Sequence, residues 1–256
     1  MCNLYSLGRQ GPDALRAFFQ ATRDATGNMP ELPAIFPNTA APVVYLREGE
    51  RTLSMMRWGL PSPAFALEGR KVDPGVTNVR NVKSPHWRRW LKPEHRCLVP
   101  FASFSENTKD ASGKAVPVWF AFGEERPLAC FAGLKVEGWT SVRKAKDGET
   151  TDNLYAFLTI EPNAEVGAVH PKAMPVILTT DEERDVWLRA PTSHDATAHC
   201  SPGRPWRMRR WPSPPRTATS PRAGSDPSSS RLCPPPTTRR RSWSSAAATD
   251  RSGHWR

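Results

Sequence analysis

The fold is decided by residues 96–106, RCLVPFASFSE. Their apolar, β-branched and aromatic side chains are typical of a strand buried on both faces, so we expect a strand over residues 96–104. The stretch ends on one carboxylate, Glu106. A partly buried glutamate with a raised pKa suits general acid–base catalysis, whereas a solvated glutamate merely closes a strand. The segment alone leaves both interpretations open.

Other strand-like segments lie on both sides of this stretch. Residues 42–47 and 52–58 flank EGER at 48–51, which predicts a hairpin. Further strands are expected at 116–122, 128–134, 155–160 and 175–178, and short helices at 13–23, with Asp13 as its cap, at 163–169 and at 181–188. Many short strands with few helices predict an α+β fold, in the form of a single, mainly β domain over residues 2–190.

The composition changes abruptly after Ala190. Residues 191–256 hold 11 of the 27 prolines, and Leu232 is their only Leu, Ile, Val or Phe. Such a segment cannot bury enough apolar surface to offset about 1–2 kcal/mol of ordering entropy per residue, which predicts a disordered tail. The tail is either a basic arm that strengthens DNA binding or the product of a frameshift in GC-rich coding sequence. The lack of any periodic pattern favours the frameshift, which resequencing of the gene would test.

The distribution of charge matters more than the total of +11. Residues 191–256 carry 12 arginines and 3 aspartates, or +9, which leaves only +2 on residues 1–190. DNA binding by the domain must therefore depend on local groups. No apolar run approaches the roughly 18 residues of a membrane span, and no secretory signal begins the chain. Five scattered cysteines without a CxxC pair favour a cytoplasmic protein with reduced thiols, and neither a metal nor a cofactor is expected.

Cys2 is the first residue with distinctive chemistry. Its small side chain permits removal of Met1, which would leave an α-amine and a thiol on adjacent carbons. An α-amine has a pKa of about 7.7–8.0, so a useful fraction is neutral and nucleophilic near pH 7. A 1,2-aminothiol condenses with an aldehyde to a Schiff base and closes through sulfur to a thiazolidine. The alternative is an incidental cysteine in a frayed terminus.

Three downstream segments add polar groups. Asn78 and Arg80 follow a turn at DPG and, two residues apart in an extended segment, project from one face; an amide there could hold an adduct and a guanidinium a phosphate. His170 stands before the apolar run at 174–178 and is either a proton carrier or a structural histidine. The segment at 84–92, SPHWRRWLK, mixes aromatic and cationic side chains that suit single-stranded DNA. Its tryptophans could equally form the buried face of a short helix with the arginines outside.

Taken together, these segments resemble the SOS-response-associated peptidase (SRAP) family. The resemblance covers roughly residues 2–190 and rests on the order of several short motifs: Met1-Cys2, RWGL at 57–60, Asn78-x-Arg80, RCLVP leading to Glu106, FAGL at 131–134, and His170 ahead of MPVIL at 174–178. The chain departs from the family where Asn3-Leu4 replaces the common Gly-Arg and where no tryptophan follows Glu106.

The resemblance implies a covalent sensor of abasic sites in single-stranded DNA. In this interpretation Cys2 forms a thiazolidine with the ring-opened sugar and so shields the lesion during replication, and the same machinery removes Met1. The catalytic set would be Cys2, Asn78, Glu106 and His170, with DNA contacts from Trp58, Arg80, Trp87, Arg88 and Arg89. We expect a monomer that associates with the nucleoid through DNA and has no membrane partner. Two alternatives stay open: an N-terminal-nucleophile amidohydrolase of the glutamine amidotransferase type, and a passive single-strand binder in which Cys2 plays no part.

Overall fold

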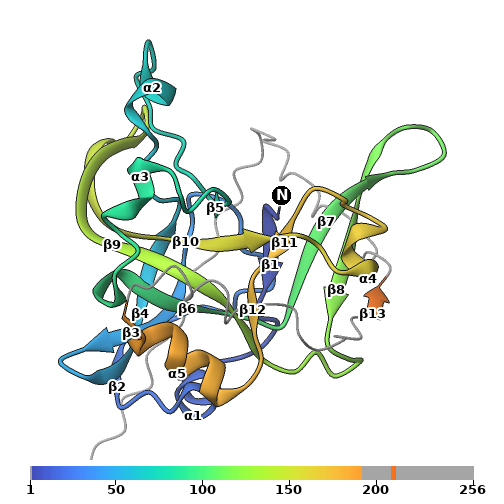
Figure 1. Ribbon diagram of the computed structural model, residues 1–256, viewed down its shortest axis with the longest axis horizontal. Helices are drawn as coiled ribbons and strands as arrows, with labels where there is room; N and C mark the ends of the chain where they lie inside the picture. The colour runs from blue at the N-terminus through green and yellow to red at the C-terminus, as the bar shows by residue number, and fades with distance from the viewer. Residues whose placement is uncertain (1, 192–208, 212–256) are drawn as a thin grey trace, which may run out of the picture. The chain divides into compact units, whose positions relative to one another are not determined.

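Two β-sheets with a few short helices make up the fold of this computed structural model, which describes residues 2–191 and 209–211. The smaller sheet has the strand order β1-β7-β8-β13 and the larger one β11-β10-β4-β3-β6-β9-β12, with β2 and β5 pairing at β4 and β10 (Figure 1). The predicted mainly β, α+β class is confirmed. No helix in residues 2–191 or 209–211 has the length and apolar character to cross a membrane.

The strands are β1 (Leu4–Ser6), β2 (Arg23–Ala25), β3 (Ala40–Arg47), β4 (Glu50–Trp58), β5 (Asn78–Val79), β6 (Arg96–Phe101), β7 (Ser103–Lys109), β8 (Ala115–Ala121), β9 (Ala129–Lys144), β10 (Gly148–Ile160), β11 (Met174–Pro175), β12 (Ile177–Leu178) and β13 (Arg209–Trp211). The helices are α1 (Pro12–Phe19), α2 (Ala64–Leu67), α3 (Pro85–Arg88), α4 (Ala164–Gly167), α5 (Asp181–Arg189) and the 3₁₀ helix η1 (Pro93–His95).

The stretch at 96–106 forms two strands, so the expectation of one strand over 96–104 was wrong. β6 pairs with β3 and β9 in the large sheet, whereas β7 pairs with β1 and β8 in the small one. The chain changes sheets at Ala102, whose backbone N–H donates to the Ser6 carbonyl at 2.8 Å. An apolar run cannot reveal such a switch, because both strands are buried alike. The switch places Glu106 in the small sheet, next to β1.

The predicted hairpin is confirmed. β3 and β4 pair from Ala40↔Arg57 to Arg47↔Glu50, and the turn residues Glu48 and Gly49 both have positive φ. Two residues with positive φ match the right-handed twist of the flanking strands. β9 and β10 extend far beyond the predicted 128–134 and 155–160 as a two-stranded ribbon of mostly polar residues, which apolar patterns do not reveal.

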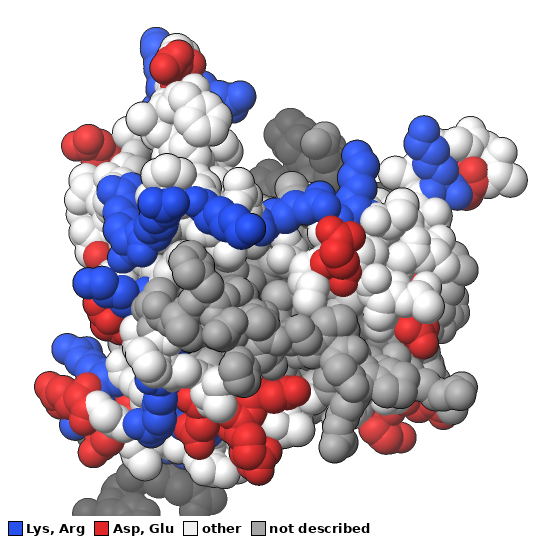
Figure 2. Space-filling view, viewed as in Figure 1, with Lys and Arg blue, Asp and Glu red and all other residues white. Residues whose placement is uncertain are grey.

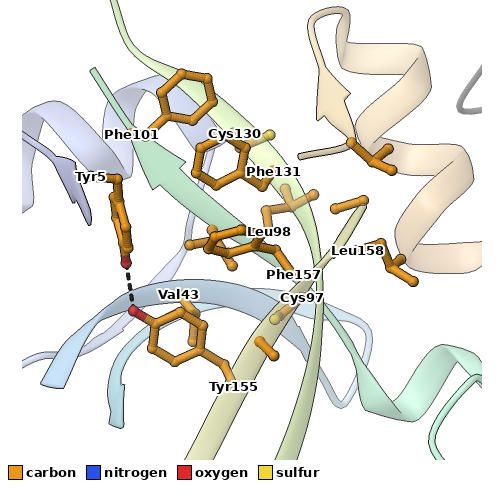
Figure 3. Packing of buried hydrophobic residues seen from close by; sticks show 14 of the residues in the cluster. Tyr5, Val43, Cys97, Leu98, Phe101, Cys130, Phe131, Tyr155, Phe157 and Leu158 are labelled. Carbon is orange, nitrogen blue, oxygen red and sulfur yellow. Dashed lines mark hydrogen bonds between the residues drawn. The ribbon is translucent and has the colours of Figure 1, made fainter. Parts of the chain in front are cut away.

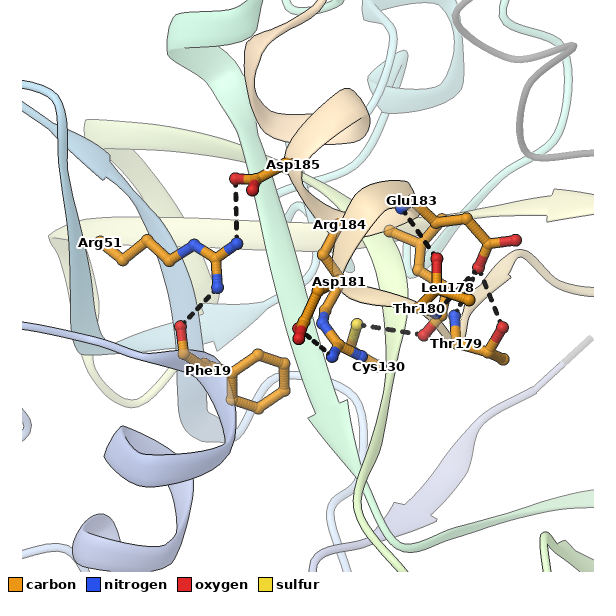
Figure 4. Close-up of polar contacts among 10 residues, drawn as sticks. All are labelled: Phe19, Arg51, Cys130, Leu178, Thr179, Thr180, Asp181, Glu183, Arg184 and Asp185. Carbon is orange, nitrogen blue, oxygen red and sulfur yellow. Dashed lines mark hydrogen bonds and ion pairs between the residues drawn. The ribbon is translucent and has the colours of Figure 1, made fainter.

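The helical predictions hold best at α5. Thr180 and Glu183 form a capping box at its start, and Arg51 of β4 ties Asp185 to the Phe19 carbonyl of α1 (Figure 4). By contrast, the helix expected at 13–23 is α1, which ends at Phe19 and is capped by Gly11 rather than Asp13. Gln20 adopts a left-handed conformation that stops the helix, and the following residues pair with β4 as β2.

The core draws side chains from both sheets and from the helices and is rich in aromatic rings (Figure 3). Phe131 is central: its ring stacks on Phe101 at 4.0 Å and meets Phe157 at 4.7 Å. Tyr5 of β1 reaches into the same core, where its hydroxyl lies 2.5 Å from that of Tyr155. Each fully buried large apolar side chain contributes about 1.5–3 kcal/mol. This packing holds β1, and with it the amino-terminal segment, firmly in the domain.

Part of the predicted tail is structured. Arg209–Trp211, which lie within the predicted tail, pair antiparallel with β8 as β13. Backbone pairing does not require the apolar side chains whose scarcity suggested disorder. The other residues of the predicted tail after Pro191 lie outside the described part of the chain.

Candidate active site at the amino terminus

Cys2 lies in a buried position directly before β1. Leu4 of β1 pairs with Ser105 of β7, so the amino-terminal residues run beside the strand that carries Glu106. Cys2 is only 1% exposed, and its thiol points back to the Leu4 carbonyl at 3.5 Å. Cys2 is therefore held in a fixed, buried position and is not part of a frayed terminus.

Asn78 holds the backbone of Cys2 through its side-chain amide. Its side-chain Nδ2 donates to the backbone carbonyl of Cys2 at 2.9 Å and to Thr77 Oγ1 at 2.8 Å. The Thr77 carbonyl in turn accepts from the indole N–H of Trp58 at 3.0 Å. Asn78 Oδ1 is buried and has no hydrogen-bond partner among the described residues. The amide thus holds the Cys2 backbone and keeps an acceptor for a further group.

Glu106 and His170 complete the polar set. His170 Nδ1 lies 4.0 Å from Glu106 Oε2, and Glu106 is 3% exposed. Burial raises the pKa of Glu106. Burial, together with the positive charges of Lys172 and Arg80, lowers the pKa of His170, which favours the neutral imidazole. A carboxylate of raised basicity and a neutral imidazole are suited to moving protons near neutral pH.

The thiol of Cys2 is neutral in this setting. Burial raises its pKa far above the usual value, and the negative charge of Glu106 adds to the effect. The thiol is therefore no ready thiolate nucleophile; it would need a base as it forms a bond to carbon. Cys97 and Cys130 are also fully buried, but each lies in the sheet without an α-amine beside it.

A cleft of about 570 Å³ opens beside this site. Asn3, Thr77 and Ser105 line it next to the polar residues, and Phe36 and Pro37 form another wall. Phe36 is 50% exposed, which is unusual for a large aromatic residue. The sequence patterns did not indicate these two residues. An exposed aromatic residue between the prolines of PAIFPN at 33–38 was the available signal, and it does not distinguish a cleft wall from an ordinary loop.

The predicted cationic residues lie at the surface. Arg80, directly after β5, has a side chain that is 52% exposed and lies 3.5 Å from Glu161. Arg88 and Arg89 are exposed at the end of α3, with Arg89 4.0 Å from the ring centre of Trp90. Figure 2 shows lysine and arginine side chains gathered in a band over α3 and β5. Positive charge is therefore concentrated locally on this surface, although the net charge of the domain is small.

Two predicted DNA contacts belong to the core instead. Trp58 is 0% exposed, with its ring 5.1 Å from Tyr5 and 5.3 Å from Phe157. A ring without exposed surface cannot stack on a base, so the prediction for Trp58 is corrected: it supports the Thr77 carbonyl. Trp87 is 6% exposed and packs as the buried face of α3, the alternative that the sequence left open. Within residues 2–191 and 209–211, no three His, Cys, Asp or Glu side chains could hold a metal ion.

Solved structures share this mainly β, α+β fold. A crystal structure of a Bordetella bronchiseptica protein matches with a TM-score of 0.60 and 23% identity, covering 82% of this chain and 98% of that one. A Bacteroides thetaiotaomicron protein matches with a TM-score of 0.62 and 19% identity over 82% and 91% of the two chains. A phage-related protein from Bordetella bronchiseptica gives 0.59 and 19% over 82% and 93%.

These similarities show the fold. The chain belongs to the SOS response associated peptidase (SRAP) family, whose model matches residues 1–213. The match extends beyond the predicted domain boundary at residue 190 and includes β13. No curated protein matches the sequence. Family membership defines residues 1–213 as an SOS-associated, peptidase-like domain.

Proposed function

We propose that this protein captures abasic sites in single-stranded DNA by forming a thiazolidine at Cys2 once Met1 has been removed. The observation that carries the proposal is the bond between the Asn78 amide and the Cys2 carbonyl, beside buried Glu106. An incidental terminal cysteine would not be held by a buried amide. The ring-opened sugar of an abasic site supplies the aldehyde that a 1,2-aminothiol requires.

The reaction begins at nitrogen. The neutral α-amine of Cys2 adds to the C1′ aldehyde of the ring-opened sugar, and loss of one water gives a Schiff base. The thiol sulfur then adds to the imine carbon, and the thiol proton is transferred to the nitrogen. The product is a five-membered ring that joins the protein to the DNA, with water as the only by-product. The burial of the thiol supports this order, because burial disfavours a thiolate, whereas a neutral α-amine is nucleophilic near pH 7.

The polar residues have separate roles in this scheme. Glu106 donates a proton to the departing hydroxyl of the carbinolamine and regains one from the nitrogen as the Schiff base forms. During ring closure it donates a proton to the nitrogen and accepts the thiol proton. His170, at 4.0 Å from Glu106, relays protons between that carboxylate and solvent, since its side chain is 18% exposed. Asn78 fixes the Cys2 backbone and offers Oδ1 to a hydroxyl of the opened sugar.

The surface supports a single strand as the partner. Arg80, Arg88 and Arg89 offer exposed guanidinium groups to phosphates, and the cleft beside Cys2 has room for an extrahelical sugar. A protein that stays attached in this way shields the lesion while replication proceeds. We also propose that Glu106 assists the hydrolysis that removes Met1, which would be the peptidase reaction of the family name.

A denaturing gel tests the proposal. The protein is mixed with a single-stranded oligonucleotide that carries one abasic site, beside an undamaged oligonucleotide and the Cys2→Ala variant. A slow band that needs both Cys2 and the lesion, together with a mass that lacks Met1, is the expected result. Absence of the band from a folded, Met1-free protein overturns the proposal. Unchanged retention of DNA by Cys2→Ala in a native gel would then favour passive binding, and glutamine hydrolysis would favour the amidohydrolase alternative.

A further inference from the structure

A cluster of two arginines and two aspartates, of which Arg143 and Asp73 are buried, lies behind the walls of the cleft. Arg143 of β9 is 4% exposed and lies 3.9 Å from Asp73, which is 7% exposed. Arg57 of β4 lies 3.1 Å from Asp152 of β10. None of these residues belongs to the catalytic set. Buried charges are costly unless they are paired, so the pair of Arg143 and Asp73 is a candidate for a specific role.

The loop before Asn78 is built around this cluster. The Asp73 carboxylate accepts from the backbone N–H groups of Gly75 at 2.8 Å and Ser62 at 3.2 Å, and the Asp73 N–H donates to the Val142 carbonyl at 2.9 Å. Gly75 has φ +76°, and a Cβ at this position would lie 2.3 Å from Arg143 Nη1. The loop therefore packs backbone directly against the guanidinium.

The fixed loop leads directly to the active-site amide. After Gly75, Val76 and Leu60 exchange two backbone hydrogen bonds of 2.8 and 2.9 Å. Thr77 then accepts from Trp58, and Asn78 donates to Cys2. The backbone from Asp73 to Asn78 is thus held by successive hydrogen bonds. The Arg143 side chain packs against the beginning of this segment, at Asp73 and Gly75.

The other wall of the cleft is tied to the same cluster. The Asn38 side chain donates to the Arg143 carbonyl at 3.4 Å, and Arg57 donates to the Asn38 carbonyl at 3.2 Å. Asn38 follows Phe36 and Pro37, which line the cleft. The cluster therefore joins both walls of the cleft beside Cys2.

We propose that Arg143 is a positioning residue that holds the 73–78 loop so that Asn78 meets the Cys2 carbonyl. It does not touch the reacting atoms; it acts through Asp73, the Gly75 backbone and Asn78. The inference rests on the proposed function for its catalytic consequence, but the effect on the loop is independent of it.

The test compares Arg143→Met with Arg143→Lys and with Arg189→Met, which removes an exposed arginine paired to Asp185. Crosslinking is measured in a single turnover at saturating abasic oligonucleotide, and binding is measured separately with an undamaged strand. Arg143→Met should slow crosslinking by about 10-fold or more, since small misplacements near reacting groups have large effects on rate. Binding should change less than the rate. Arg143→Lys should recover part of the rate, and Arg189→Met should match the unaltered protein.

Non-additivity distinguishes positioning from a general loss of stability. If Arg143 acts through Asn78, the double variant Asn78→Ala/Arg143→Met should crosslink no more slowly than Asn78→Ala alone. A folded Arg143→Met with an unaltered rate, or an additive double variant, overturns the inference. If Arg143→Met does not fold, Gly75→Ala serves as the second variant, because its Cβ would collide with the Arg143 guanidinium. It must then show the same loss of crosslinking rate.

Hydrogen exchange separates this inference from the proposed function. Arg143→Met should increase backbone exchange in residues 73–80 and leave α5 unchanged. That result with no crosslink in the unaltered protein would retain the positioning role and reject the abasic-site proposal. Unchanged exchange in residues 73–80 would reject the positioning role, whether or not the unaltered protein crosslinks.

Discussion

The side-chain amide of Asn78 donates a 2.9 Å hydrogen bond to the backbone carbonyl of Cys2, a residue 76 positions earlier in the chain. Because this bond orients the residue whose α-amine would react, its loss should affect the rate of crosslinking more than the affinity for DNA. Asn78→Ala is expected to slow crosslinking to an abasic strand by about 100-fold, the cost typical of a misplaced reacting group. Single-turnover gels provide the measurement. Asn28→Ala, an exposed asparagine, should crosslink at the unaltered rate, and an equal loss in both variants would contradict the assigned role.

The two nucleophilic atoms of Cys2 can be separated by Cys2→Ser. The serine keeps the α-amine and loses the thiol, so the reaction should stop at a reversible Schiff base. Little or no adduct should survive a denaturing gel unless borohydride reduces the imine first. Cys97→Ala and Cys130→Ala should keep the stable adduct, because these thiols are buried in the sheet. A stable adduct of Cys2→Ser without reduction would exclude the thiazolidine.

The raised pKa of Glu106 makes stability depend on pH. Burial causes the folded state to hold this proton more tightly than the unfolded chain does. Stability is therefore lost as pH rises from the unfolded pKa of about 4.3 through the higher folded pKa. Glu106→Gln removes this titration, so the Tm of the variant minus that of the unaltered protein should increase across this window and then level off. Scanning calorimetry at several pH values measures it, with exposed Glu68→Gln as the control. A difference independent of pH would contradict the assignment.

Trp58 should behave as a core residue. Trp58→Phe keeps an aromatic ring but loses the 3.0 Å bond to the Thr77 carbonyl, which is worth about 0.5–1.5 kcal/mol. For a domain of this size the Tm should fall by about 2–4 °C for each kcal/mol. Affinity for undamaged single-stranded DNA should not change. Weaker DNA binding with an unaltered Tm would instead restore Trp58 as a DNA contact.

The exposed arginines of α3 should act through phosphates. Arg88→Gln with Arg89→Gln should weaken binding to single-stranded DNA of any sequence. If each arginine contacts one phosphate, the slope of log K against log salt should decrease by about 0.7 for each. Fluorescence anisotropy at several salt concentrations measures the slope, and Arg9→Gln, an exposed arginine outside α3, is the control. An unchanged slope would show that α3 lies outside the DNA path.

Local patterns determined much of the fold. The β3–β4 hairpin follows from two strand patterns around a short turn, and α5 matches the helix predicted over 181–188, because such signals act between residues close in sequence. They could not reveal that the chain changes sheets at Ala102, since a buried strand reads the same in either sheet. Nor could they show the length of β9 and β10, whose outer halves are polar.

For the candidate site, too, the sequence and the tertiary structure determined different features. The sequence by itself determined which chemical groups are present: an aminothiol precursor at Cys2, an amide at Asn78, a carboxylate at Glu106 and an imidazole at His170. Only the tertiary structure decided that the amide holds Cys2 and that the carboxylate is buried 4.0 Å from the imidazole. It also showed that Trp58 lies in the core and that Arg143 lies behind the cleft. The physical reason is that chemical type belongs to the residue, whereas distance and burial arise from contacts between strands far apart in the chain.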